Sequence, residues 1–308
     1  MTGPVNRGRV VLHVGAHKTA TTHLQQSIDA HAAALAADGV LFLGPRALRR
    51  DDDLPLQRIL NWPGPLGPLR AVVAPGFAAM CRTRRHVFLS EENMLGFAYG
   101  DGQIRDDMLY PDATHRLRKV LTALDLRDTE VLLAVRDPAY LLVSAYGQRL
   151  LVGDFLPFDV FAAGVDVASL RWSDLVARLL PIARIGSVTI WRYEDYPEVF
   201  PAVLRRALPE PWPGKIAPLP EASHAGLSQR AFAQLQRWHE EGGGPDHAHP
   251  ALVARAMFPK SATDPGIAPL SPHVLARSAR AYARDLDALR RRRAVTFLDL
   301  EPDSAGKA

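Results

Sequence analysis

The segment from Val10 to Gln25 (VVLHVGAHKTATTHLQ) constrains the fold more than any other part of the chain. Four of its first five residues are apolar and three of them are valine, which favours a short buried strand. Gly15 interrupts this run, and after Thr22 apolar side chains recur at helical spacing until Gly39, which is suited to end a helix in a left-handed conformation. The segment therefore predicts a strand, a short turn and the N-terminus of a helix.

The turn between this strand and this helix has the composition of an anion-binding site. Backbone N–H groups and the helix dipole attract negative charge at a helix N-terminus. Lys18 adds a positive charge, and the hydroxyls of Thr19, Thr21 and Thr22 add donors. We expect a phosphate or sulfate ester as the ligand. The alternative is that the turn only joins the strand to the helix and leaves Lys18 solvated.

The turn differs from a regular Walker A loop. That motif has a lysine directly between a glycine and a Ser or Thr, with an earlier glycine upstream. Here Lys18 comes three residues after Gly15, and no second glycine lies between them. The departure argues against a standard nucleoside triphosphate site.

Length and composition narrow the class of protein. A chain of 308 residues can bury a sizeable core, and its net charge of +4 with a pI near 9.4 favours an anionic ligand only weakly. Cys81 is the single cysteine, which excludes an internal disulfide and fits a reducing compartment. No apolar run approaches the length of a membrane span, and no signal peptide is evident. We expect a soluble, cytoplasmic, bacterial protein with no nucleic-acid partner.

Further apolar runs alternate with amphipathic stretches, which predicts an α/β domain with a mostly parallel sheet. The predicted strands after the first are residues 40–43, 86–89, 130–135 and 187–191, and residues 295–300 are a further candidate. We expect one domain, with a core at 9–210 and a C-terminal helical annex at 221–300. Residues 46–85 are expected to be mainly loop, either a lid or acceptor-binding element or a surface insertion.

Charged residues follow several of these strands, where ligands bind in open parallel sheets. Glu91 and Glu92 follow the strand at 86–89 and form either a helix N-terminal charge pair or a catalytic acid or base. Arg136 follows the strand at 130–135, and the next residue, Asp137, is expected to cap a helix.

Three of these motifs together resemble the sulfotransferases that use 3′-phosphoadenosine 5′-phosphosulfate (PAPS), and in particular the bacterial carbohydrate-type members. The motifs are HVGAHKTATT at 13–22, Arg136-Asp-Pro followed by Ser144-Ala-Tyr, and Tyr193-Glu-Asp. The resemblance covers about Val10 to Tyr196. It implies a P-loop NTPase-like three-layer sandwich with a central, mostly parallel, five-stranded sheet.

The resemblance also implies a role for each residue of the turn. The residues that would bind the 5′-phosphosulfate are Lys18, Thr19, Ala20, Thr21 and Thr22. Lys18 would lie near the bridging oxygen and stabilise charge on the leaving phosphate, and Thr21 and Thr22 would donate hydrogen bonds to the 5′-phosphate. Related loops usually carry glycine where this chain has Ala20, which matters if the position needs a positive φ.

The other two motifs are assigned in the same way. Arg136 and Ser144 match the pair that grips the 3′-phosphate, and Tyr193 matches a position near the adenine. Glu92 matches a glutamate that could remove the proton of the acceptor, with Glu91 as the fallback. The late Arg-Lys-Gly loop of the cytosolic members has no evident match; the run at 290–293 either substitutes for it or is a solvated helix end.

The implied reaction is in-line transfer of a sulfuryl group to an acceptor hydroxyl of a sugar, lipid or small metabolite. The second product is adenosine 3′,5′-bisphosphate, and no metal is required. Glu92 or His17 would act as the base, although His17 can equally be a loop-packing residue. The alternatives are a small-molecule kinase that uses ATP and Mg²⁺, and a non-catalytic protein that binds a nucleotide or polyanion. The acceptor and the oligomeric state are not encoded in any motif.

Overall fold

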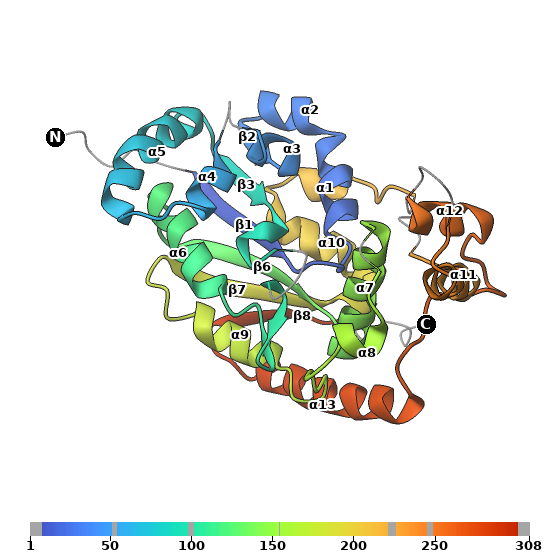
Figure 1. Ribbon diagram of the computed structural model, residues 1–308. Helices are drawn as coiled ribbons and strands as arrows, with labels where there is room; N and C mark the ends of the chain where they lie inside the picture. The colour runs from blue at the N-terminus through green and yellow to red at the C-terminus, as the bar shows by residue number, and fades with distance from the viewer. Residues whose placement is uncertain are drawn as a thin grey trace, which may run out of the picture.

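A central parallel sheet organises the computed structural model, which describes residues 8–50, 54–97, 102–153, 155–220, 226–244 and 249–300. Six strands lie in the order β2-β3-β1-β6-β7-β8, and every neighbouring pair is parallel. Helices flank the sheet on both faces (Figure 1). The strands are β1 (Arg9–Gly15), β2 (Val40–Leu43), β3 (His86–Ser90), β6 (Thr129–Val135), β7 (Ile185–Arg192) and β8 (Val295–Leu298).

The predicted α/β fold with a parallel central sheet is confirmed, but the sheet has six strands and not five. The additional strand is β8, the candidate at 295–300, which pairs with β7 from Val188 opposite Val295 to Trp191 opposite Leu298. Its half-buried Val295 and Phe297 pack against the core. Such a short edge strand is stabilised by its neighbour, so its own sequence gives little sign of it.

Two layers of helices cover the sheet. One face packs against α1 (Thr21–Asp29), α2 (Ala32–Ala37) and α10 (Tyr196–Ala207). The other face packs against α4 (Leu56–Leu60), α5 (Leu66–Cys81), α6 (Ala113–Ala123), α9 (Trp172–Leu179) and α13 (Pro272–Arg290). The remaining elements are α3 (Pro45–Leu48), η1 (Glu92–Met94), the hairpin of β4 (Ile104–Arg105) and β5 (Met108–Leu109), α7 (Pro138–Leu151), α8 (Phe158–Phe161), η3 (Tyr193–Asp195), η4 (Trp212–Gly214), α11 (Gln229–Glu240) and α12 (Pro250–Met257).

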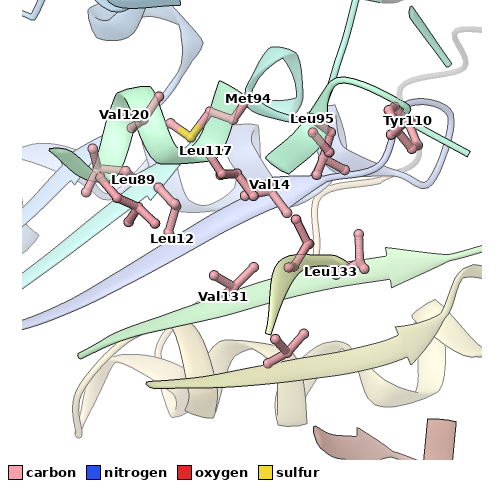
Figure 2. Close-up of a cluster of buried hydrophobic side chains, with 14 of the residues drawn as sticks. Leu12, Val14, Leu89, Met94, Leu95, Tyr110, Leu117, Val120, Val131 and Leu133 are labelled. Atoms are coloured by element: carbon pink, nitrogen blue, oxygen red, sulfur yellow. The ribbon is translucent and has the colours of Figure 1, made fainter. Parts of the chain in front are cut away.

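Strand alternation builds the core beneath α6. Leu12 and Val14 of β1 point to the same face as Val131 and Leu133 of β6, and all four side chains are buried (Figure 2). Successive side chains of a strand point to opposite faces, so the intervening His13 lies on the face covered by α1 and α10. The sheet is therefore apolar on both faces, as expected for a parallel sheet between two helical layers.

The expectation that residues 46–85 are mainly loop is wrong. This segment contains α3, α4 and α5, and the side chains of Leu69, Phe77 and Cys81 are buried in the core. The helix α5 includes Pro75 in its interior, so the Pro and Gly residues that indicated a loop lie within or beside helices. Tertiary packing outweighs their unfavourable helix propensity. Residues 51–53, part of the same expectation, lie outside the described residues.

Other local predictions are confirmed with one adjustment. The helix after Thr22 is divided at Ala30 and His31 into α1 and α2, because His31 has non-helical backbone angles, and it ends as expected with Gly39 at φ 74°. The Asp137 carboxylate caps α7 by accepting a hydrogen bond from the N–H of Ala139.

The topology places the carboxyl end of β1 at the point where the strand order reverses. The chain runs from β1 to β2 at one edge, returns in β3 beside β1, and then crosses to β6 on the other side of β1. Ligands in open parallel sheets bind at such a switch point. The loops after β1, β3, β6 and β7 all leave the sheet at this edge.

The C-terminal part of the chain lies in two places. The helices α11 and α12 pack against each other beside α7, at the right of Figure 1. In contrast, α13 and β8 return to the sheet, where α13 contacts α7 and α9. Within the described ranges, no helix combines the length and apolar character that crossing a membrane requires. The boundary between a core at 9–210 and an annex at 221–300 stays a prediction.

Candidate active site

The loop between β1 and α1 has an unusual backbone. Gly15, Lys18 and Ala20 have φ angles of 72°, 64° and 59°. Glycine adopts this left-handed region freely, whereas a residue with a Cβ pays roughly 1–2 kcal/mol. The position of Ala20 therefore does need the positive φ that glycine accepts best, and alanine adopts it here.

Two threonine hydroxyls of the loop form hydrogen bonds within the loop itself. Thr19 Oγ1 donates to the carbonyl of Ala16 at 2.7 Å, and Thr21 Oγ1 donates to the same carbonyl at 3.0 Å. The Thr22 side chain is exposed at the start of α1. Of the three hydroxyls expected to face a ligand, only that of Thr22 is not engaged within the loop.

The N-terminus of α1 has no side-chain cap. Ala20 is the N-cap residue, and the first helical hydrogen bond runs from the N–H of Leu24 to the carbonyl of Ala20 at 3.2 Å. The N–H groups of residues 21–23 therefore precede the helical ladder and point out of the helix end. They form a set of donors for an anion, beside the side chain of Lys18.

Lys18 is partly buried beside α7. Its Nζ donates to Gln148 Oε1 at 3.0 Å, and within the described part of the chain it has no carboxylate partner. Burial, and then the positive charge of Arg136, lower the pKa of Lys18. The lysine is thus a partly desolvated cation that only neutral groups contact.

Arg136, at the end of β6, reaches the same loop. Its Nη1 donates to the carbonyl of Lys18 at 2.7 Å, and its guanidinium lies 4.4 Å from the centre of the Tyr193 ring. Burial lowers the pKa of Arg136, and across the described ranges no carboxylate forms an ion pair with it. The loops after β1, β6 and β7 therefore meet as the sequence motifs predicted.

Ser144 lies on α7, partly buried, four residues before Gln148. Residues four apart share a helix face, so Ser144 lies on the side of α7 from which Gln148 reaches Lys18. The contact between Gln148 and Lys18 was not predicted from the sequence. The only signal for it was this four-residue spacing from Ser144, which by itself does not distinguish a functional glutamine from a solvated one.

Glu92 lies directly against the loop. A Cβ built on Gly15 would come within 3.0 Å of the Glu92 Cβ, so the two backbones approach closely. Its carboxylate accepts hydrogen bonds from Gln25 Nε2 at 3.2 Å and from Arg49 Nη2 at 3.0 Å. Burial raises the pKa of Glu92, but its backbone hydrogen bond, His17, Arg49 and Gln25 outweigh this and lower it.

Glu91 has a different environment. Its side chain is fully buried, and Arg49 holds both of its oxygens at 2.8 Å. The N–H of Asn93 donates to the same carboxylate at 3.1 Å. Glu91 thus ties α3 to the start of η1, and it is the less suitable of the two glutamates for accepting a proton from a substrate.

His17 is buried in the loop and contacts two residues that sequence reasoning missed. Its N–H donates to Tyr110 Oη at 2.9 Å, and its Nδ1 lies 3.2 Å from the same oxygen. Its Nε2 lies 3.4 Å from Asn93 Oδ1. Burial lowers the pKa of His17 to about 4, so the ring is neutral at pH 7. Asn93 directly follows the predicted site residues Glu91 and Glu92, but no motif surrounds Tyr110, and neither contact with His17 was predicted.

The arginine run at 290–293 lies at the end of α13. Arg290 pairs with Asp299 at 2.6 Å and with Asp287 at 3.3 Å, and it stacks on Phe297. These contacts favour the interpretation of the run as a helix end and not as a phosphate-binding loop.

Comparison with known proteins adds a distant structural likeness. No protein-family model matches the sequence, and no curated protein matches it. Among solved structures, the chain is similar to a sulfotransferase from Alicyclobacillus acidocaldarius at 14% identity and a TM-score of 0.42, with 94% of this chain and 98% of that chain covered. The proposal below therefore rests on the geometry of the site.

Proposed function

We propose that this protein is a sulfotransferase that moves the sulfuryl group of PAPS to an acceptor hydroxyl. The observation that carries the proposal is the pair of partly buried cations, Lys18 and Arg136, beside the uncapped N-terminus of α1. Burying a cation without a carboxylate partner is unfavourable unless another anion compensates it. A ligand with two anionic groups fits this arrangement, and PAPS carries one at each end of its ribose.

Each group in the site has a task in this reaction. The N–H groups at the start of α1 and Lys18 stabilise the charge that develops on the 5′-phosphate as its bond to sulfur breaks. Arg136 and Ser144 bind the 3′-phosphate, and Tyr193 lies beside the adenine. The acceptor oxygen forms the new bond to sulfur, and its proton passes to the base. The second product is adenosine 3′,5′-bisphosphate.

Glu92 is our proposed base. It lies against the loop, and its carboxylate accepts hydrogen bonds from Gln25, Arg49 and its own backbone N–H, which leaves a lone pair for an acceptor hydroxyl. His17 is neutral and could also accept a proton, but both of its ring nitrogens already lie near Tyr110 or Asn93. We therefore assign His17 to the support of the loop, with Glu92 receiving the proton.

A kinase that uses ATP and Mg²⁺ is the rival enzyme class. Asp137 is the residue that would imitate a metal-binding aspartate at the end of β6. Its Oδ1 accepts from the N–H of Ala139 at 2.9 Å and from Ser278 Oγ at 2.5 Å, so it serves as a helix cap. This observation places the kinase second. A non-catalytic nucleotide-binding protein would use the same loop without turnover.

Calorimetric titration with adenosine 3′,5′-bisphosphate tests the proposal, with ATP and Mg²⁺ as the comparison. We expect the bisphosphate to bind and ATP with Mg²⁺ to bind far more weakly. A preference for ATP with Mg²⁺ would favour the kinase, and binding without transfer to any of a panel of sugar, lipid and phenol hydroxyls would favour the non-catalytic protein. No heat with either ligand would contradict the proposal.

Replacement of Lys18 by alanine tests the role of the loop. We expect Lys18→Ala to lower the transfer rate by about a hundredfold or more, because one preorganised charge-stabilising donor is lost. Lys215→Ala is the matched control, since Lys215 lies over the Trp212 ring in η4. Equal rates in the wild type and in Lys18→Ala would rule out this assignment.

A further inference from the structure

The helix α13 presents three buried polar side chains to the rest of the molecule. Ser278, Tyr282 and Asp285 are 0%, 5% and 4% exposed. Their spacing of four and then three residues places them on one face of the helix. Buried polar groups are unfavourable unless they form hydrogen bonds, so the partners of this row show what the helix is fixed to.

The first partner lies next to Arg136. Ser278 Oγ donates to Asp137 Oδ1 at 2.5 Å, and the N–H of Ala139 donates to the same carboxylate oxygen. Asp137 directly follows Arg136 and caps α7. Ser278 therefore fixes the first turn of α7 and the backbone on the C-terminal side of Arg136.

The second partner is Glu194, the residue after Tyr193. Tyr282 Oη donates to Glu194 Oε2 at 3.1 Å, and the other oxygen of Glu194 accepts from the N–H of Asp137 at 3.0 Å. Glu194 follows Tyr193, whose ring lies under Arg136. One carboxylate thus links α13, the loop after β6 and the loop after β7.

The third residue of the row, Asp285, is linked to Arg136 through Trp172. Asp285 Oδ2 accepts from the N–H of Trp172 at 2.7 Å, at the start of α9. The indole Nε1 of Trp172 then donates to the carbonyl of Arg136 at 2.8 Å. The buried row on α13 therefore leads to Arg136 by three separate routes.

We infer that α13 belongs to the anion-binding machinery, with Tyr282 acting as a positioning residue for Arg136. The inference rests on the proposed function, because it assigns to Arg136 the binding of the 3′-phosphate. The apolar Leu286 and Leu289 already bury α13 in the core, so its attachment to the sheet does not need the Tyr282 hydroxyl. The hydroxyl instead holds the carboxylate that joins the two loops around Arg136.

The charge of Glu194 agrees with this role. Burial lowers the pKa of Arg136, and the charges of Glu194 and Asp137 are among those that oppose this effect. Tyr282, the N–H of Asp137 and Arg192 at 3.7 Å hold the Glu194 carboxylate near Arg136, with which Glu194 itself forms no direct ion pair. The guanidinium therefore stays oriented while remaining available to an external anion.

The test compares two buried tyrosines that each donate one hydrogen bond. Tyr282→Phe removes the bond to Glu194, and Tyr146→Phe removes the bond from Tyr146 Oη to the carbonyl of Leu156 at 2.8 Å, which does not lead to Arg136. We expect Tyr282→Phe to raise the Kd for adenosine 3′,5′-bisphosphate by about tenfold, as for loss of a hydrogen bond to a charged group. Tyr146→Phe should leave it unchanged.

A double-mutant cycle separates positioning from general loosening. In an Arg136→Ala background, Tyr282→Phe should have no further effect on the Kd, because the residue through which it acts is absent. Glu194→Gln should raise the Kd at least as much as Tyr282→Phe, because it also removes the charge that pairs with Arg192, and it serves as the second variant if Tyr282→Phe unfolds. Urea unfolding without ligand establishes that the compared variants are folded.

The outcomes distinguish this inference from the proposed function. If the wild type binds the bisphosphate and Tyr282→Phe and Tyr146→Phe bind it equally, the role of α13 is refuted and the proposed function stands. A full effect of Tyr282→Phe in the Arg136→Ala background also refutes it. If the wild type does not bind the bisphosphate, the proposed function fails, and the inference fails with it.

Discussion

Lys18 and Arg136 determine the chemistry of the site at the scale of single residues. Each is partly buried, and burial lowers the pKa of each. Within the described residues, the side chains of Lys18 and Arg136 contact the amide of Gln148, a backbone carbonyl and the Tyr193 ring, none of which cancels a full charge. A bound anion would satisfy both cations, and this is why we propose an anionic ligand for the site.

Ala20 gives a prediction at the same scale. Its φ of 59° is unfavourable for alanine, so Ala20→Gly should raise the free energy of unfolding by about 1 kcal/mol, measured by urea denaturation. Ala30→Gly is the control, because Ala30 has a φ of −57° and glycine should destabilise the protein there. A loss of stability in both variants would contradict the argument.

At the residue scale, the sequence predicts some features of the candidate site and not others. Lys18 and Arg136 were found because charged residues after buried strands meet at one edge of a parallel sheet. The engagement of Thr19 and Thr21 within the loop could not be foreseen, because spacing does not show whether a hydroxyl faces a ligand or its own backbone. Gln148 depends on how α7 is rotated, which the sequence does not specify.

The elements around the loop place different functional groups on two sides of it. The helix α7 brings Ser144 and Gln148 to one side of the loop, next to Lys18. The turn η1 brings Glu92 to another side, against Gly15, where Arg49 and Gln25 hold its carboxylate. This division separates groups that bind the donor from the group proposed to accept the proton.

Alanine substitutions on the two sides should therefore have different effects. We expect Ser144→Ala to raise the Kd for adenosine 3′,5′-bisphosphate several-fold, since a hydroxyl to the 3′-phosphate is lost. Glu92→Ala should change this Kd little while it reduces the transfer rate. Calorimetry gives the Kd and a sulfuryl-transfer assay gives the rate. The reverse order of the two Kd values would show that the roles are exchanged.

Elements with strong local signals were predicted well. Helix caps such as Asp137, and apolar runs such as the one that forms β1, follow from short-range chemistry. The helix α5 was missed because the Pro and Gly residues at 61–68, before and within its first turn, are typical of loops, and β8 was underrated because it is short and half exposed. Both are stabilised by contacts with distant segments, which sequence patterns do not contain.

At the scale of the whole molecule, the stability should depend on pH through a histidine in the sheet. His13 is buried between Phe88 and Trp191, and its Nδ1 lies 2.7 Å from Ser90 Oγ. Burial lowers its pKa from 6.5 to about 4, although the charge of Glu92 opposes the shift. The unfolded chain therefore binds more protons between these two pH values, and the folded protein loses stability as the pH falls through that range.

The size of this loss of stability follows from the shift in the pKa of His13. We expect the contribution of His13 to the free energy of unfolding to fall by about 2 kcal/mol between pH 7.5 and pH 5. Urea denaturation at both pH values measures it, and His13→Gln should show a smaller difference by that amount. Parallel behaviour of the two proteins would mean that His13 does not titrate as described.

The row of buried contacts on α13 has a consequence for biosynthesis. A ribosome makes the loop at 15–20 well before α13, so an earlier and a later segment of the chain meet around Arg136. A nascent chain that has released only its first strands already contains Lys18, but not the residues that orient Arg136. If α13 orients Arg136 as we propose, competence to hold an anion is acquired only once α13 has been made, and a chain that stops before α13 lacks it.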